Sequence, residues 1–209
     1  TLVEQLRSDG HTIDRIDLGG GLGIPYFEDE GESPPPSPEE YGTMVKAVVG
    51  NLGCKVMLEP GRVIMGNAGI LVSKVVYVKQ GPSRRFIILD AAMNDLIRPS
   101  FYNAHHAIMP VAEPAVDAAY EEADVVGPIC ESGDTFAKQR PMPPLNDGDA
   151  IAFKSAGAYG AVMSSFYNAR PLVPEVLVTG DKFAVVRRRI EVSDMMAFES
   201  MPDWLEGSG

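Results

Sequence analysis

Hydrophobic and polar positions follow two different rhythms along the chain. Residues 13–18 alternate as a strand does, and residues 38–51 then follow a helical pattern. Ser37 and Glu40 form a capping-box signature at the start of that helix. A short apolar strand is expected over residues 55–58. Strand, helix and strand in this order predict β/α units.

Short β-rich runs separated by Gly, Pro and Asp replace this rhythm after about residue 68. Such runs are typical of an antiparallel sheet or a small barrel. We therefore expect a domain boundary near residue 66. The runs cover residues 71–78, 85–89, 124–126, 150–153, 173–178 and 183–186.

The remaining segments connect or end these elements. Residues 1–6 have the pattern of the later turns of an amphipathic helix and lack an initiator methionine, so we expect the chain to be part of a longer polypeptide. A Pro- and Glu-rich loop spans residues 24–38. The basic run at residues 187–189 is expected at the solvated end of a strand. The tail over residues 193–209 is expected to form a capped helical turn and a polar end.

Composition and charge narrow the class of protein. The 209 residues, with a mass of 22.5 kDa, are 45% hydrophobic, which is enough to fill a core. The 18 basic and 29 acidic residues give a net charge of −11. This charge argues against a nucleic-acid or anionic-membrane partner, because either would need a basic face. No apolar run approaches the roughly 20 residues of a membrane span.

Cysteine and histidine usage indicates a reducing compartment and no metal site. Cys54 lies in an apolar run and Cys130 in a polar one, so we expect no disulfide and a cytoplasmic location. We interpret Cys54 as a core residue. With 3 histidines and no Cys-x-x-Cys pair, the sequence has no metal-ligand spacing.

Two motifs that follow the predicted strands could carry chemistry. Gly19, Gly20, Gly21 and Gly23 come after the first strand. Clustered glycines let backbone N–H groups approach an anion such as phosphate, although a plain tight turn is the other interpretation. Glu59 ends the second strand, where β/α barrels place catalytic groups, although a surface acid would give the same pattern.

Arginine and tyrosine side chains provide candidate ligands. Arg62 and Arg98 could hold a carboxylate or phosphate through their forked guanidinium groups, or could form surface ion pairs. Tyr102 and the histidines at 105–106 make the segment after Arg98 rich in polar contacts. Tyr159, between small residues, could donate one directed hydrogen bond or could be half-buried packing.

Cys130 and Glu131 open the stretch in which chemistry is most expected. A free cysteine is most often a core thiol. The neighbours of Cys130 are polar or flexible, however, and end in Gly133 and Asp134. They therefore indicate an exposed loop.

In their order along the chain, these motifs resemble those of the bacterial diaminopimelate decarboxylases, in the ornithine, diaminopimelate and arginine decarboxylase family. The likeness covers nearly the whole chain. The motifs are Gly19-Gly20-Gly21-Leu22-Gly23, Glu59-Pro60-Gly61-Arg62, Arg98-Pro99-Ser100-Phe101-Tyr102-Asn103-Ala104-His105-His106, Cys130-Glu131-Ser132-Gly133-Asp134 and Ala156-Gly157-Ala158-Tyr159-Gly160.

The resemblance implies an alanine-racemase-like fold, of α/β plus all-β class. Residues 1–66 would be the last segments of a TIM-like β/α barrel. Residues 67–209 would be an antiparallel β-domain of small-barrel or Greek-key type. The same resemblance implies the reaction of the diaminopimelate decarboxylases, which use pyridoxal 5'-phosphate to remove CO2 from meso-diaminopimelate and give L-lysine.

The resemblance also implies roles for single residues. The four glycines of the first motif would hold the cofactor phosphate with help from Tyr159, and Glu59 would pair with the pyridine nitrogen. The substrate would be bound by several side chains, and Cys130 would act as general acid. The implied cofactor-binding residues are Gly19, Gly20, Gly21, Gly23, Glu59, Gly61, Arg62 and Tyr159, and the implied substrate-binding residues are Arg62, Arg98, Tyr102, Glu131 and Tyr159.

The resemblance further implies a partner subunit and a missing N-terminal half. In this family the cysteine loop enters the partner subunit's active site, so a homodimer with shared active sites is implied. The lysine that carries the cofactor lies upstream of the glycine motif, but only 18 residues precede Gly19 and none is lysine. The chain therefore resembles the C-terminal half of the enzyme, without the N-terminal barrel half, and alone it should not catalyse.

Other functions remain open at this point. Ornithine, arginine and carboxynorspermidine decarboxylases share the glycine, Glu-Pro-Gly-Arg and cysteine motifs. Arg98 favours a substrate with a distal carboxylate, which ornithine lacks. A non-catalytic relative that kept the β-domain and lost the lysine is a further interpretation.

Overall fold

The computed structural model describes residues 1–26 and 33–205. Residues 27–32 of the expected Pro- and Glu-rich loop and residues 206–209 of the tail lie outside this description. The domain boundary expected near residue 66 stays a prediction. The chain divides into a first compact unit, of residues 1–71, 105–109 and 152–158, and a second, of residues 72–104, 110–151 and 159–209.

The first unit contains the short helices and the parallel strand pair. Both predicted strands and the predicted helix are present, although the first strand covers only residues 15–17 of the expected 13–18. Ser37 and Glu40 form the expected capping box: the Glu40 N–H donates to Ser37 Oγ at 3.2 Å, and the Ser37 N–H donates to Glu40 Oε2 at 2.8 Å. The elements are α1 (Leu2–Ser8), β1 (Arg15–Asp17), α2 (Pro38–Val49), β2 (Lys55–Met57), α3 (Arg62–Met65) and the 3-10 helix η1 (Gly66–Ala68).

Cys54 is half-buried, so the interpretation of Cys54 as a core residue is wrong. Its sulfur lies 3.2 Å from Arg7 Nη2 and accepts a hydrogen bond from it. The same sulfur lies 3.7 Å from the Leu52 carbonyl oxygen and 3.8 Å from that of Ile13. An apolar neighbourhood in the sequence is thus a polar neighbourhood in space, because a turn and a helix end cover the thiol.

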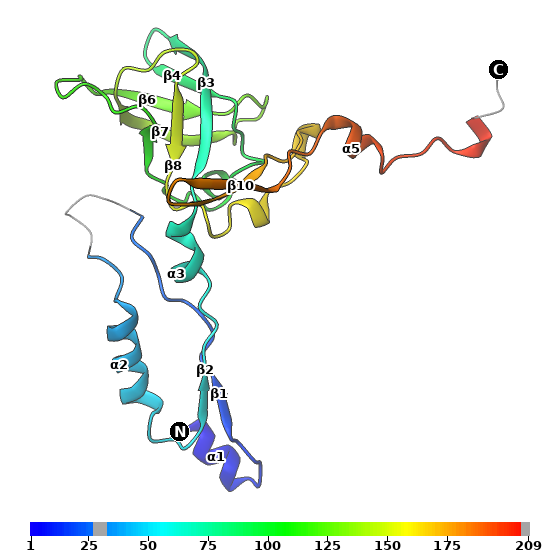
Figure 1. Ribbon diagram of the computed structural model, residues 1–209. Helices are drawn as coiled ribbons and strands as arrows, with labels where there is room; N and C mark the ends of the chain where they lie inside the picture. The colour runs from blue at the N-terminus through cyan, green and yellow to red at the C-terminus, as the bar shows by residue number, and fades with distance from the viewer. Residues whose placement is uncertain (27–32, 206–209) are drawn as a thin grey trace. The chain divides into compact units, whose positions relative to one another are not determined.

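A curled six-stranded sheet has the strand order β5-β8-β3-β4-β6-β7 (Figure 1). β3 and β4 pair antiparallel, as do β6 and β7, but β4 and β6 run parallel. The prediction of an antiparallel sheet is therefore wrong for the β4–β6 pair, and the sheet is mixed. A parallel pair needs a long crossover connection, which residues 90–120 provide. The strands are β3 (Leu71–Gln80), β4 (Arg85–Leu89), β5 (Ile108–Pro110), β6 (Glu121–Val126), β7 (Thr135–Met142) and β8 (Ala150–Phe153).

β5 and β7 had no clear signal in the sequence. Pro141 lies within β7, and Gln139 in the same strand has φ +48°. The pairing of β7 with β6 also shifts register between Ala123 and Val125. A bulge and a proline break the alternation by which a strand is found.

Side chains from several strands fill the core of the sheet. Val75, Ile87 and Val125 are fully buried on β3, β4 and β6, and Phe153 is fully buried on β8. Along β3, buried Ser73 and Val75 alternate with exposed neighbours, as a half-buried strand requires.

A hairpin and a C-terminal tail follow the sheet in the chain. β9 (Glu175–Thr179) and β10 (Lys182–Arg187) pair antiparallel, and the basic run begins at the end of β10 as expected. The expected helical turn is α5 (Val192–Met196). Arg188 donates to both carboxylate oxygens of Asp194, at 2.6 and 2.7 Å, and this contact lowers the pKa of Asp194 to about 2. The 3-10 helices of this part are η2 (Ala161–Met163), η3 (Tyr167–Ala169) and η4 (Asp203–Leu205).

Candidate active site

The glycine turn and Glu59 follow the two parallel strands of the first unit and lie side by side. β1 and β2 pair from Arg15 opposite Lys55 to Asp17 opposite Met57. Beyond them, the Glu59 N–H donates to the Gly19 carbonyl at 2.8 Å. Ligands of α/β sheets bind outside the carboxyl ends of parallel strands. The structure thus brings together two motifs that lie far apart in the sequence.

The glycine turn has a shape that only glycine permits. Gly19 and Gly21 have φ values of +69° and +99°, in the left-handed region. A Cβ atom on Gly20 would lie 2.6 Å from the Glu59 carbonyl oxygen, and one on Gly23 would lie 3.2 Å from Pro35 Cβ. The turn is therefore bare backbone, which is the kind of concave surface that binds phosphate.

Arg62 follows Gly61 at the start of α3 and contacts Tyr26, which in turn contacts His106. Its Nη1 donates to the Tyr26 hydroxyl at 3.0 Å, and its guanidinium carbon lies 5.6 Å from the Tyr26 ring centroid. The Tyr26 ring meets the His106 ring edge to face, with centroids 5.6 Å apart. His106 is buried, and its Nδ1 lies 2.9 Å from the Lys154 carbonyl, so Nδ1 carries a proton. These contacts limit the orientations that the Arg62 side chain can take.

Gly157 packs against the helical segment that follows Arg62. Its N–H donates to the Gly66 carbonyl at 3.0 Å, and the Ala156 N–H donates to the Gly69 carbonyl at 2.8 Å. A Cβ on Gly69 would lie 2.7 Å from the Gly157 Cα. This backbone contact explains why the small residues before Tyr159 are needed.

In the second unit, α4 (Arg98–Tyr102) carries two of the predicted ligands. Arg98 is only 6% exposed, and its guanidinium carbon lies 5.9 Å from the Tyr159 ring centroid. Tyr159 is 41% exposed and has φ +61°. Tyr102, at 59% exposure, packs edge to face on Phe101. The structure brings Arg98 and Tyr159 together and leaves Tyr102 at the surface.

Cys130 and Glu131 lie in an exposed loop between β6 and β7, as the sequence predicted. The Gly133 N–H donates to Glu131 Oε1 at 3.1 Å, and the Tyr167 hydroxyl donates to Glu131 Oε2 at 3.4 Å. The Glu131 carboxylate is thus held from two sides. Cys130 remains at the surface of the loop, where a thiol can reach a ligand.

A buried polar network holds the segment that leads into α4. Arg170 donates from Nε to Asn94 Oδ1 at 3.0 Å and from Nη2 to the Asp90 carbonyl at 2.6 Å. Its Nη2 also lies 3.9 Å from Asp95 Oδ2. Burial raises the pKa of the Asp95 carboxyl, although the Ala92 N–H and Arg170 act in the opposite direction. Arg170 directly follows η3, so the network connects the segment before α4 with Tyr167.

Sequence reasoning missed several of these side chains. Tyr26, Asn94 and Tyr167 follow no strand and belong to no glycine cluster, so no pattern pointed to them. His106 belongs to the adjacent pair of histidines that did indicate a polar segment. Asp134 was visible only as the last residue of the cysteine motif.

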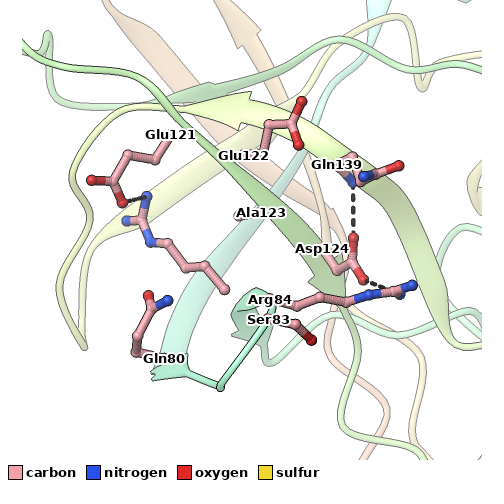
Figure 2. A pocket seen from close by; sticks show the side chains of 9 residues that line it. Gln80, Ser83, Arg84, Glu121, Glu122, Ala123, Asp124 and Gln139 are labelled. Atoms are coloured by element: carbon pink, nitrogen blue, oxygen red, sulfur yellow. Dashed lines mark hydrogen bonds and ion pairs between the residues drawn. The ribbon is translucent and has the colours of Figure 1, made fainter.

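A separate pocket of about 170 Å³ lies on the sheet between β3, β4, β6 and β7 (Figure 2). Arg84 pairs with Asp124 at 3.1 Å, and the Gln139 N–H donates to the same carboxylate at 2.8 Å. Arg85 lies 3.8 Å from Glu121. None of the predicted site residues lines this pocket, and both of its arginines pair with carboxylates of the same pocket. It is therefore not the candidate site.

The described residues contain neither a cluster of metal ligands nor a helix that could cross a membrane. In residues 1–26 and 33–205, no three His, Cys, Asp or Glu side chains gather in a way that could hold a metal ion. None of the helices described has both the length and the apolar composition needed to cross a bilayer.

Comparison with known proteins shows which proteins the chain is similar to. The family model for the C-terminal sheet domain of pyridoxal-dependent decarboxylases matches residues 12–157. Diaminopimelate decarboxylase of Zymomonas mobilis is 48% identical over 204 residues, which are 98% of this chain and 47% of that protein. The corresponding enzyme of Aquifex aeolicus is 47% identical over 189 residues, or 90% of this chain and 44% of that protein.

Solved structures show the same similarity. Diaminopimelate decarboxylase from Helicobacter pylori, crystallised with L-lysine, superimposes with a TM-score of 0.84 at 38% identity, over 94% of this chain and 47% of that one. The chain spans about half the length of the curated relatives it matches. Because the family model covers well over half of the residues, the chain belongs to the pyridoxal-dependent decarboxylases, of which it contains the C-terminal sheet domain.

Proposed function

We propose that the chain is the C-terminal half of a diaminopimelate decarboxylase, a lyase that converts meso-diaminopimelate to L-lysine and CO2. The relatives from Zymomonas mobilis and Aquifex aeolicus carry that name, and a structural relative was crystallised with L-lysine. The observation that carries the proposal is the contact between the glycine turn and Glu59 at the ends of two parallel strands. In this proposal, residues 1–66 are the last β/α segments of a barrel that the N-terminal half completes.

The cofactor we propose is pyridoxal 5'-phosphate, and the residues of the glycine turn fit its phosphate. The Gly19 N–H already donates to Asp17 Oδ1 at 2.8 Å. The amides of Gly20, Gly21 and Gly23 are therefore the proposed phosphate donors, with the Tyr159 hydroxyl as a further one. When bound, the cofactor supplies an electron sink for the bond that breaks as CO2 leaves.

Glu59 is proposed to keep the pyridine nitrogen protonated. Glu59 is exposed, follows β2 and donates its backbone N–H to Gly19 of the glycine turn. A nearby carboxylate favours the cationic form of a ring nitrogen, since opposite charges stabilise each other. A protonated ring accepts electrons more readily than a neutral one. Gly61 is the N-cap of α3, and Arg62 begins that helix three positions after Glu59.

The distal carboxylate of the substrate is proposed to bind Arg62, Arg98 and Tyr102. A guanidinium fork recognises a carboxylate through two parallel hydrogen bonds, which an ammonium group cannot form. Burial of Arg98 and the face of the Tyr159 ring reduce the number of orientations that this fork can take. This arrangement favours diaminopimelate over ornithine, which has no distal carboxylate.

Glu131 is proposed to bind the distal ammonium group, and Cys130 to protonate the carbon that has lost CO2. The Gly133 N–H and the Tyr167 hydroxyl orient the Glu131 carboxylate. A positioned general acid contributes about 10²–10⁴-fold to rate. We further propose a cytosolic homodimer in which the cysteine loop serves the partner subunit's active site.

The test uses the full-length enzyme that contains this half. The wild-type enzyme is expected to release CO2 from meso-diaminopimelate much faster than from ornithine. Cys130→Ala should lower kcat about 10²–10⁴-fold with little change in KM, because the thiol acts only in proton transfer. Arg98→Lys should mainly raise KM, because one of two parallel hydrogen bonds is lost.

Matched controls come from the same chain. Cys54→Ala removes the other thiol, and Arg189→Lys alters an exposed arginine, so both should leave kcat and KM unchanged. Faster turnover of ornithine than of diaminopimelate would reverse the choice of substrate. Wild-type kinetics in Cys130→Ala would show that the thiol is not the acid.

A further inference from the structure

Asp134 is a buried carboxylate with two backbone donors, one from each of two separate segments. The Ile129 N–H donates to Asp134 Oδ2 at 2.7 Å, and the Met93 N–H donates to Asp134 Oδ1 at 2.7 Å. Asp134 itself is 3% exposed. Ile129 and Met93 lie outside helices and strands, so their amides have no ladder partner and depend on this side chain.

The first of these segments is the loop that carries Cys130 and Glu131. Asp134 closes that loop from within, because its N–H donates to the Glu131 carbonyl at 3.0 Å. The Gly127 N–H donates to the Asp134 carbonyl at 2.9 Å. A Cβ on Gly127 would overlap the Asp134 carboxylate, so the chain passes directly against the charged group. The loop therefore has one anchor at each end.

The second segment leads into the helix that carries Arg98. Met93 lies five positions before Arg98, in a turn of residues 93–95 that precedes α4 in the chain. The helix also touches the loop directly, since a Cβ on Gly133 would lie 3.0 Å from Ser100 Oγ. The carboxylate and this contact together hold the loop against the start of α4.

We propose that Asp134 is a positioning residue for decarboxylation, because its carboxylate sets the place of both the Cys130 loop and the segment before Arg98. The inference rests on the proposed function for the roles of Cys130 and Arg98. In the proposed homodimer, the cysteine loop serves the partner subunit's site and Arg98 serves its own. One Asp134 side chain would then act on proton transfer in one site and on substrate binding in the other.

Asp134→Asn in the full-length enzyme tests this role, because an amide is nearly isosteric but replaces one acceptor oxygen with a donor. The NH2 group would face a backbone N–H, and one of the two segments would detach. We expect kcat to fall and KM to rise together, with kcat/KM lower by about 10- to 100-fold, since a displacement of 1 Å can cost about 10²-fold. Hydrogen exchange should become at least about 10-fold faster in the peptides around Met93 and Ile129.

Asp147→Asn is the matched control. Asp147 Oδ1 accepts the Val78 N–H at 3.0 Å, which is the same kind of contact outside the site motifs. This variant should keep wild-type kinetics and wild-type exchange around Met93 and Ile129. Wild-type exchange in Asp134→Asn, or a change in only one of kcat and KM, would overturn the proposal.

If Asp134→Asn does not fold, hydrogen exchange in the wild-type enzyme tests whether Asp134 anchors the two segments. The amides of Met93 and Ile129 should then exchange slowly despite lying in turns, and rapid exchange at either one would refute the anchoring role. Exchange also separates this inference from the proposed function. An enzyme inactive on diaminopimelate would disprove the function, while the exchange data would still report on Asp134.

Discussion

The guanidinium carbon of Arg98 lies 5.9 Å from the centre of the Tyr159 ring, and Arg98 is almost fully buried. A cation over an aromatic face is stabilised by about 0.5–2 kcal/mol, more when water is excluded. Two parts of the Tyr159 side chain therefore have different roles. The ring supports Arg98, and the hydroxyl is the proposed phosphate donor.

Two substitutions of Tyr159 should separate these tasks. Tyr159→Phe keeps the ring, so we expect an unchanged KM for diaminopimelate and weaker cofactor binding. Tyr159→Leu removes the ring as well, so KM should rise about 2- to 30-fold, which corresponds to the loss of about 0.5–2 kcal/mol. Steady-state kinetics at saturating cofactor and a cofactor titration by absorbance measure the two effects. Equal KM values for Phe and Leu would show that the ring does not support Arg98.

Gly20→Ala should disturb the glycine turn. The added methyl group would lie 2.6 Å from the Glu59 carbonyl oxygen, and backbone on both sides limits relaxation. We expect a loss of about 1–3 kcal/mol in the free energy of unfolding, as for other overpacked sites, together with weaker cofactor binding. Urea unfolding and cofactor titration provide the measurements.

Gly42→Ala is the control for that substitution. Gly42 lies inside α2, and a Cβ there would meet no atom within 4 Å. Alanine in a helix is more favourable than glycine by about 0.5–1 kcal/mol, so this variant should be as stable as the wild type or slightly more stable. If both variants lost stability equally, the contact with Glu59 would not be the cause.

Asp95 should make stability depend on pH in an unusual direction. Burial raises the pKa of its carboxyl in the folded protein above the unfolded value of about 3.9. Between those two pKa values the folded state binds more protons than the unfolded state, so the free energy of unfolding falls as pH rises. In Asp95→Asn this fall should be smaller. Urea unfolding at several pH values from about 3.5 to 7 measures the slopes.

Asp194→Asn offers a comparison of opposite sign. The contact with Arg188 lowers the pKa of Asp194 to about 2. Its contribution is therefore present above about pH 4 and is lost as pH falls through about 2. An exposed pair contributes little, so only a small change in the free energy of unfolding, confined to acidic pH, is expected.

For Asp95→Asn, a free energy of unfolding that fell more steeply with pH than that of the wild type would contradict the argument that burial raises the pKa of Asp95.

Local sequence signals determined the helix α2, the short strands β1 and β2 and the positions of the site motifs. Ser37 and Glu40 start α2 through contacts within one turn, and such contacts need no distant partner. The exposed setting of Cys130 followed in the same way from its immediate neighbours. The order of the motifs also determined the family.

Tertiary structure alone decided how these pieces meet. The parallel pairing of β4 with β6, the bulged strand β7 and the half-buried state of Cys54 depend on segments far apart in the chain. The same holds for the Arg98–Tyr159 contact and for the carboxylate of Asp134 between Ile129 and Met93. A strand pattern gives the faces of a strand but not its neighbours, and a buried polar group finds its donors only after the chain has folded.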